Sequence, residues 1–156
     1  MTELQELRAA ERLYLDDLEV GQRFKSGTHT VDEAEIKAFA QQFDPQPFHL
    51  DPGAAKESLF GGLVASGWHT AAVTMRLLVE GGVPLAGGIV GAGGEITWPA
   101  PVRPGDVLRV ESEVVELRPS RSRPDRGIAT VRSETRNQRG DVVQNLTAKL
   151  FVPRRT

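Results

Sequence analysis

Residues 66–79 read SGWHTAAVTMRLLV, and Arg76 is the only charged side chain between Trp68 and Val79. A run of this length with so few polar side chains predicts a helix that is buried nearly all round. Gly81-Gly82 follows, where glycine commonly ends a helix. The sequence therefore predicts one long helix in the interior of the fold.

After this helix the chain changes to segments rich in Val, Ile and Thr. Short turn sequences rich in Pro, Gly and Asp separate four predicted strands, which are residues 87–98, 106–117, 127–137 and 141–152. In the last segment, alternate residues from Val142 to Val152 share one face. Because short turns join antiparallel neighbours, we expect an antiparallel sheet that packs against the helix.

The part of the chain before the helix is predicted to contain one strand and two helices. They are a strand over residues 22–30, a helix over 32–43 and a short helix over 51–59. Pro47 is expected to keep the stretch between the two helices extended. The order of a strand, helices and then four strands predicts an α+β fold.

The composition excludes several classes of protein. The chain has 156 residues, no cysteine and a formal net charge of −2. This length fits a single domain, which we place at residues 16–153 after an N-terminal arm over 1–15. The absence of cysteine excludes disulfides, thiolate metal sites and cysteine nucleophiles. The near-neutral charge gives no general attraction to nucleic acid or anionic membranes, and the lack of a long apolar run or signal segment predicts a cytoplasmic protein.

The segment Asp44-Pro45-Gln46-Pro47-Phe48-His49-Leu50-Asp51 carries the best candidate for chemistry. Two prolines limit its conformations, so Asp44 and His49 can face one point at a small ordering cost. A carboxylate and an imidazole placed in this way could deprotonate one water and then return its proton. Two alternatives stay open: a rigid loop with a capping Asp51 and a surface histidine, or a metal site of Asp44, His49 and Asp51.

The start of the long helix is a second candidate site. Backbone N–H groups at a helix N-terminus have no partner within the helix, and Gly67 would let a ligand oxygen approach them. The alternative is that Ser66 only caps the helix and Gly67 only permits close packing. We expect His69, one turn further on, to be a hydrogen-bonded core or interface residue rather than a catalyst.

The sequence resembles the MaoC-like dehydratase family, which includes the (R)-specific enoyl-CoA hydratases. The resemblance runs from about residue 16 to 152, and it is carried by Phe39-Ala40, Asp44 to Asp51, Phe60 to Gly67, and Trp98 to Asp106. It implies a hotdog fold, an antiparallel sheet wrapped around one long central helix at about residues 67–80. It also implies Asp44 and His49 as catalytic residues and the Gly67 N–H as donor to the thioester oxygen. Ser66 and Trp68 are candidate pocket residues.

The chain departs from the family pattern at three positions. Gln46 stands where the family often has Asn, Ser66 where it often has His, and Ala72 where some hydratases carry Ser. Arg118, Arg121, Arg123 and Arg126 surround one predicted turn. They are either a solvated turn or a site for the phosphates of coenzyme A.

The resemblance implies a hydro-lyase that reversibly hydrates a trans-2-enoyl-CoA, or a related acyl thioester, to the (R)-3-hydroxyacyl thioester in fatty acid metabolism. An acyl-CoA thioesterase and a non-catalytic acyl-thioester-binding subunit stay open as alternatives. We expect no metal and no cofactor, since coenzyme A enters as part of the substrate. The expected assembly is a homodimer or higher homo-oligomer, with neither nucleic acid nor membrane as partner.

Overall fold

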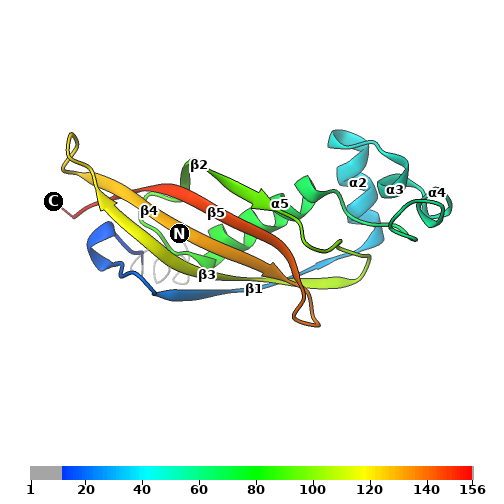
Figure 1. The fold of residues 1–156 in the computed structure, drawn as a ribbon, viewed down its shortest axis with the longest axis horizontal. Helices are drawn as coiled ribbons and strands as arrows, with labels where there is room; N and C mark the ends of the chain where they lie inside the picture. Colours follow the sequence, from blue (N-terminus) through cyan, green and yellow to red (C-terminus); the bar gives the residue numbers. More distant parts are fainter. Residues whose placement is uncertain (1–11, 156) are drawn as a thin grey trace, which may run out of the picture.

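A five-stranded antiparallel sheet forms the main layer of the protein (Figure 1). The computed structural model describes residues 12–155. The strands are β1 (Arg23–Val31), β2 (Val90–Thr97), β3 (Asp106–Pro119), β4 (Arg126–Arg136) and β5 (Val142–Pro153). They lie in the order β1-β3-β4-β5-β2, and each neighbouring pair is antiparallel. The predicted antiparallel sheet is therefore confirmed, and β1 and β2 are its two edges.

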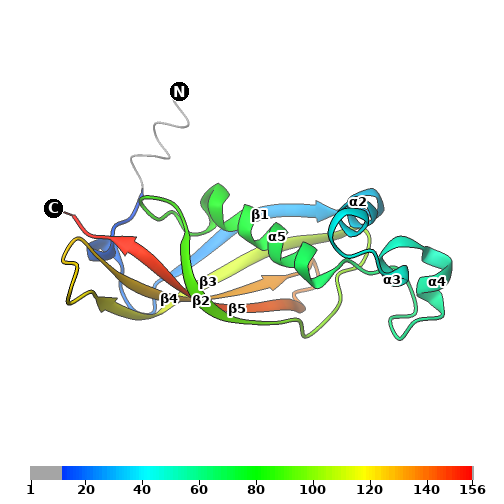
Figure 2. The same cartoon turned by 90° about the horizontal axis from the view of Figure 1, so that it is seen from above.

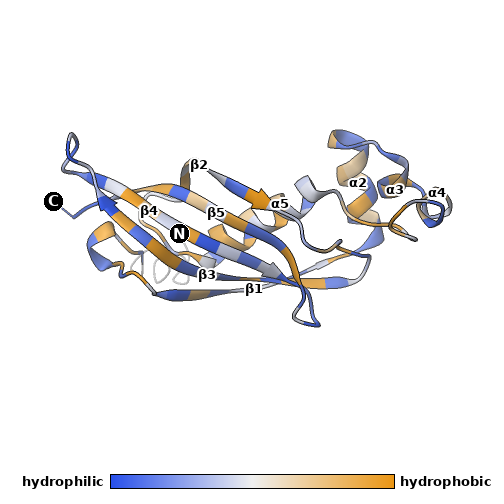
Figure 3. Cartoon of the chain, in the orientation of Figure 1, coloured by the Kyte–Doolittle hydropathy of each residue, from blue (hydrophilic) through white to orange (hydrophobic). Residues whose placement is uncertain are grey.

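Helix α5 (Gly67–Leu77) lies along one face of this sheet (Figure 2). Val73 and Leu77 of α5 belong to the same buried core as Leu108, Val110 and Val131 of the sheet. The strands alternate between hydrophobic and hydrophilic residues (Figure 3), so that one face supplies the core and the other faces away from α5. The hotdog arrangement of one long helix on a curved sheet is therefore present.

The end of the long helix follows the glycine pair. A π-helical turn, Leu78–Gly82, continues α5. Within it Gly81 has φ of 133°, a conformation that side chains with a Cβ rarely adopt. The chain therefore leaves the helix at this glycine and passes to the edge strand β2.

The prediction that this helix is buried nearly all round is wrong for the single chain. His69, Thr70, Val73, Thr74 and Leu77 are buried. On the opposite side, an exposed α5 stripe consists of Trp68, Ala72, Met75 and Val79. The reason is geometric, since an open sheet covers only one side of a helix. The exposed stripe repeats at helical spacing, as an apolar contact face does.

The alternation predicted for the last strand is interrupted once. Thr135 pairs with Gln144 and Arg136 with Val142, so Val143 is an extra residue in β5. At this bulge two consecutive residues, Val143 and Gln144, are buried. Residues 145–148 are half-buried, and at the end of the strand the predicted alternation holds, with Leu150 and Val152 buried and Phe151 exposed. Gln144 lies on the same side of β5 as Leu150 and Val152, so the alternation itself points its polar side chain into the interior, and the bulge adds Val143 to the buried residues.

Three helices precede α5: α2 (Glu33–Phe43) and the shorter α3 (Pro47–Leu50) and α4 (Pro52–Lys56). The prediction of an extended stretch after Pro47 is wrong, because this proline occupies the first helical position, where its fixed φ favours a helix. Helix α4 also ends earlier than predicted. There the Ser58 hydroxyl donates to the Ala55 carbonyl at 2.5 Å, which competes with continuing the helix.

The N-terminal segment joins the domain before residue 16. Leu13 forms a parallel bridge with Leu85, and Leu15 is buried in the core. Residues 1–11, most of the predicted arm, lie outside the described residues. The domain limits at 16 and 153 stay a prediction.

Candidate active site

The loop that carries Asp44 and His49 is built from two helix ends. Asp44 follows the last residue of α2, and its N–H donates to the Ala40 carbonyl at 2.9 Å. Pro45-Gln46 then turns the chain into α3, on which His49 is the third residue. The two candidate catalytic residues therefore lie at adjacent helix ends, and the turn between them brings their side chains together.

Asp44 and His49 form an acid–histidine pair in which the histidine is buried and the carboxylate is half-buried. The Asp44 Oδ2 atom lies 3.2 Å from His49 Nε2, and His49 is only 5% exposed. His49 Nδ1 lies 2.6 Å from the Val64 carbonyl oxygen. Because a carbonyl can only accept, Nδ1 must carry the proton that it donates there. Nε2 is therefore the nitrogen that is left to exchange a proton with Asp44 or with a water.

The Asp44 carboxylate is held in its ionised form. Burial raises the pKa of Asp44, but hydrogen bonds from the Ser66 hydroxyl and the Gln46 amide, with the charge of His49, outweigh burial and lower the pKa below its usual value. The Gln46 amide donates to Asp44 Oδ1 at 2.5 Å. The departure at Gln46 thus supplies a direct donor to the candidate catalytic carboxylate.

The start of α5 lies beside this pair. Ser66 is fully buried, and its hydroxyl accepts from the Trp68 N–H at 3.2 Å. Gly67 is the first residue of the helix, so its N–H has no carbonyl one turn earlier to bond. The segment before it is fixed on both sides, since the Val64 N–H donates to the Phe48 carbonyl and the Ala65 N–H to the Val102 carbonyl.

One cavity of about 450 Å³ contains both parts of the site. Asp44, His49 and Gly67 all line it. Its other walls are mainly apolar. They come from Gln46 and Phe48 near the pair, from Phe60, from the stretch with Val64, Ala65, Trp68 and Thr70, and from the stretch Trp98 to Val102. This volume is in the range of small-molecule sites, in which a few polar groups converge within apolar walls.

The structure separates the sequence candidates into those that reach the cavity and those that do not. Trp68 lines the cavity, whereas Ser66 lies behind it and contacts Asp44. Asp51 caps α4 by accepting from the Gly53 N–H. The capping role that the sequence suggested for Asp51 is therefore present. Within residues 12–155, no group of three His, Cys, Asp or Glu side chains is arranged to hold a metal ion.

His69 is buried at the back of the site, in contact with α2. Its Nε2 lies 3.2 Å from Glu35 Oε2, and its ring stacks on Phe39 at 4.8 Å. Burial lowers the pKa of His69. The charge and hydrogen bond of Glu35 oppose this shift, whereas the charges of His29 and His49 lower the pKa further. His69 does not line the cavity, which agrees with the prediction of a core residue.

Sequence reasoning missed two contributors to the site. The Val64 carbonyl that fixes His49 lies 15 residues away along the chain, and backbone acceptors have no sequence signal. The sequence indicates Trp98 only as part of a family motif. Its role as a cavity wall depends on contact with Gly67, which no local pattern indicates.

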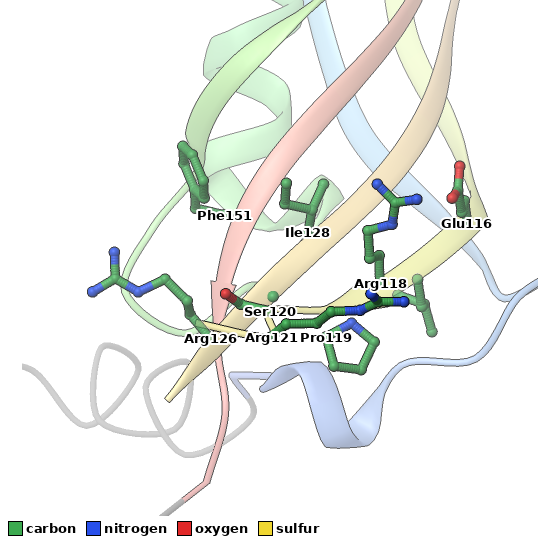
Figure 4. A pocket seen from close by; sticks show the side chains of 10 residues that line it. Glu116, Arg118, Pro119, Ser120, Arg121, Arg126, Ile128 and Phe151 are labelled. Carbon is green, nitrogen blue, oxygen red and sulfur yellow. The ribbon is translucent and has the colours of Figure 1, made fainter. Parts of the chain in front are cut away.

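The arginine cluster lies at a different cavity, of about 700 Å³ (Figure 4). Arg118, Arg121 and Arg126 line it together with Ile128 and Phe151. Ile128 pairs with Phe151 across the sheet, one residue out of step with the buried pair Ala129 and Leu150. This cavity therefore opens on the face that points away from α5. None of its residues lines the cavity that contains the pair Asp44 and His49, which we call the dyad and the dyad cavity. A phosphate-binding role for these arginines stays a prediction.

The described part of the chain contains no helix with the length and apolar character needed to cross a membrane.

Comparisons with known proteins agree with this architecture. The family model of the MaoC-like domain matches residues 17–137. A crystal structure of the MaoC-like dehydratase from Rhodospirillum rubrum is 64% identical, with a TM-score of 0.91, over 92% of this chain and 99% of that one. The 3-hydroxybutyryl-CoA dehydratase of Methylorubrum extorquens is 37% identical over 126 residues, 77% of this chain and 73% of the relative.

A more distant solved structure has the same fold. The (R)-hydratase from A. caviae involved in PHA biosynthesis is 31% identical, with a TM-score of 0.71, over 87% of this chain and 98% of that one. The family model spans most of the chain, and the similar structures share its helix and antiparallel sheet. The chain therefore belongs to the MaoC-like dehydratase family and has its hotdog fold.

Proposed function

We propose that the protein hydrates a trans-2-enoyl-CoA, or a related acyl thioester, reversibly to the (R)-3-hydroxyacyl thioester. The observation that carries this proposal is the convergence of Asp44, His49 and the first N–H group of α5 in one cavity. The names of two relatives, a 3-hydroxybutyryl-CoA dehydratase and an (R)-hydratase, support the same reaction class.

Each group has a role that follows from its geometry. The Gly67 N–H would donate to the thioester oxygen and stabilise the negative charge that develops there. Asp44 and His49 Nε2 would hold one water, whose oxygen attacks the β-carbon while its proton passes to the pair. That proton would then be returned to the α-carbon, so that water adds across the double bond. The reaction as proposed needs no metal and no cofactor beyond the coenzyme A of the substrate.

A direct assay tests the reaction. Incubation with crotonyl-CoA should decrease the enoyl-thioester absorbance and give the (R)-3-hydroxy product on chiral analysis. Asp44→Asn and His49→Gln should each lower kcat between about a hundredfold and ten thousandfold. Asp51→Asn is the matched control, because it changes a carboxylate of the same loop that lies outside the cavity and preserves the cap.

Other outcomes would replace the proposal. Release of free thiol without a hydroxy product would indicate thioester hydrolysis instead. Binding of acyl-CoA in calorimetry without any turnover would indicate a binding subunit. Full activity of the Asp44→Asn, His49→Gln double variant would refute the assigned roles.

We further propose that the protein acts as a homodimer in the cytoplasm. The exposed α5 stripe places Trp68, Met75 and Val79 in solvent at 60%, 40% and 62% exposure, and the edge strand β2 is exposed along nearly its whole length. Apolar patches and open strand edges of this kind mark association surfaces. Light scattering should give a dimer mass, and Met75→Glu with Val79→Glu should shift it towards the monomer.

A further inference from the structure

Trp98 is packed directly against the start of α5. A Cβ atom placed on Gly67 would lie 2.7 Å from Cε2, 2.9 Å from Cδ2 and 3.0 Å from Cζ2 of the indole. The indole therefore occupies the space that a side chain at residue 67 would need. It covers the glycine from one side and forms a wall of the cavity beside the Gly67 N–H.

A chain of buried polar side chains fixes this indole. Trp98 Nε1 donates to Gln144 Oε1 at 3.0 Å, and Gln144 Nε2 donates to Thr74 Oγ1 at 3.1 Å. The Thr74 and Thr135 hydroxyls lie 2.6 Å apart. Gln144, Thr74 and Thr135 are fully buried. Rotating the indole away would leave the buried Gln144 oxygen without its donor, which is unfavourable.

The remaining aromatic residues close the cavity around the dyad. Trp68 packs edge-to-face on Trp98 with ring centroids 5.3 Å apart. On the other side Phe48 contacts His49 at 4.5 Å and Phe60 at 5.3 Å. An acyl chain that places its β-carbon between the dyad and Gly67 thus meets aromatic rings on both sides, and of these rings only that of Trp98 is held by a hydrogen bond to a fully buried side chain, Gln144.

We propose that Trp98 is a specificity-determining residue that ends the acyl site at Gly67 and restricts the protein to short acyl chains such as crotonyl. This inference rests on the proposed function, since it assigns the substrate class of the same cavity. It follows from the contact of the indole with Gly67 and from the polar chain that prevents the indole from swinging aside.

The test is a chain-length profile. We expect kcat/KM of the unaltered protein to fall from crotonyl-CoA to trans-2-octenoyl-CoA. Trp98→Ala should raise the ratio of octenoyl to crotonyl kcat/KM about tenfold or more. Trp98→Phe keeps a ring against Gly67 but loses the bond to Gln144, so it should give a smaller rise. Phe151→Ala is the matched control, because Phe151 has the same exposure, 39% against 40%, and lies outside the cavity.

A binding measurement separates this inference from the proposed reaction. Calorimetry with butyryl-CoA and octanoyl-CoA should show the same change in relative affinity for Trp98→Ala, whether or not the protein turns over enoyl-CoA. A shift in relative affinity without turnover would overturn the proposed reaction and keep the inference. Unchanged ratios in the folded Trp98→Ala and Trp98→Phe variants, or no binding of either acyl-CoA by the unaltered protein, would overturn the inference.

Discussion

Two acid–histidine pairs lie in this protein with nearly the same internal geometry. Asp44 and His49 approach to 3.2 Å, and so do Glu35 and His69. The two histidines are 5% and 4% exposed. The pairs differ in their surroundings, because Asp44 and His49 line the cavity at the start of α5 and the other pair does not.

The second ring nitrogen also distinguishes the two pairs. His49 Nδ1 donates to the Val64 carbonyl, whereas His69 Nδ1 has no hydrogen-bond partner within residues 12–155. Glu35 is further shared with His29, whose Nε2 lies 2.8 Å from Glu35 Oε1. The distance between an acid and a histidine therefore does not by itself identify a catalytic pair. Access to a cavity and an oriented ring are what support Asp44 and His49, rather than Glu35 and His69, as the proposed catalytic pair.

The largest expected effect is the contrast between the two pairs in activity. Asp44→Asn should lower kcat for crotonyl-CoA hydration at least about a hundredfold, because it removes the proton acceptor. Glu35→Gln should keep kcat within a few-fold, since Glu35 does not line the cavity. Steady-state kinetics of both variants, with melting curves to confirm folding, measure the contrast. Equal losses in the two variants would mean that both pairs take part in the reaction.

The next effect tests whether activity depends on the cavity that Asp44 and His49 line, by disturbing the packing of Gly67 in its wall. Gly67→Ala would place a methyl group 2.7 Å from the Trp98 indole, and one of the two must move. We expect kcat/KM to fall between about tenfold and a hundredfold, because displacements near 1 Å have such effects. Gly27→Ala is the control, since a Cβ there meets nothing within 4 Å. An active Gly67→Ala variant with an undisturbed near-ultraviolet dichroism spectrum would contradict the packing described.

A smaller effect concerns the acid limb of the pH–rate profile. The Ser66 hydroxyl is one of the groups that lower the pKa of Asp44. Ser66→Ala should therefore raise the pKa of Asp44 and move the acid limb of kcat/KM to higher pH. Ser66→Thr keeps a hydroxyl, so the acid limb of kcat/KM should stay at the pH of the unaltered protein. A limb that does not move in Ser66→Ala would show that this hydroxyl does not stabilise the carboxylate.

The smallest effect concerns the second pair and the stability of the fold. Burial lowers the pKa of His69 below the usual histidine value of about 6.5, so the folded state binds this proton less readily than the unfolded state. The stability contributed by neutral His69 is present above pH 6.5 and is lost as the pH falls through the lowered pKa. His69→Phe should weaken this acid-side decline and change stability at pH 7 by about 1 kcal/mol or less. Urea denaturation at several pH values measures the free energy of unfolding. An unchanged decline of this free energy at acid pH would show that groups other than His69 cause it.

Much of the fold could be predicted from local patterns. The β-branched segments and turn sequences located all five strands, and the Asp44 to Asp51 motif located the dyad. The burial of α5 was predicted wrongly, because a hydrophobic run does not say whether a second molecule or the same chain covers it. The helix at Pro47 was also missed, since proline favours both a first helical position and an extended segment.

The parts of the site that escaped prediction depend on contacts between distant residues. Trp98 and Gln144 are 46 residues apart, and their bond exists only because the sheet and α5 bring the inward side of β5 next to Trp98. The Val64 carbonyl that orients His49 is a backbone atom, which any residue type supplies. Patterns of residue type indicate which groups are present, but the bond that fixes each group comes from the assembled sheet and helix.

The two tryptophans give the protein an optical reporter of its own. The chain contains two Trp residues, and both line the dyad cavity. Their rings stand edge-to-face 5.3 Å apart, and one donates to a buried amide. Since the whole indole emission arises at the cavity, a ligand that enters should change fluorescence intensity or wavelength. Acyl-CoA binding could then be followed by titration and stopped flow without an attached dye.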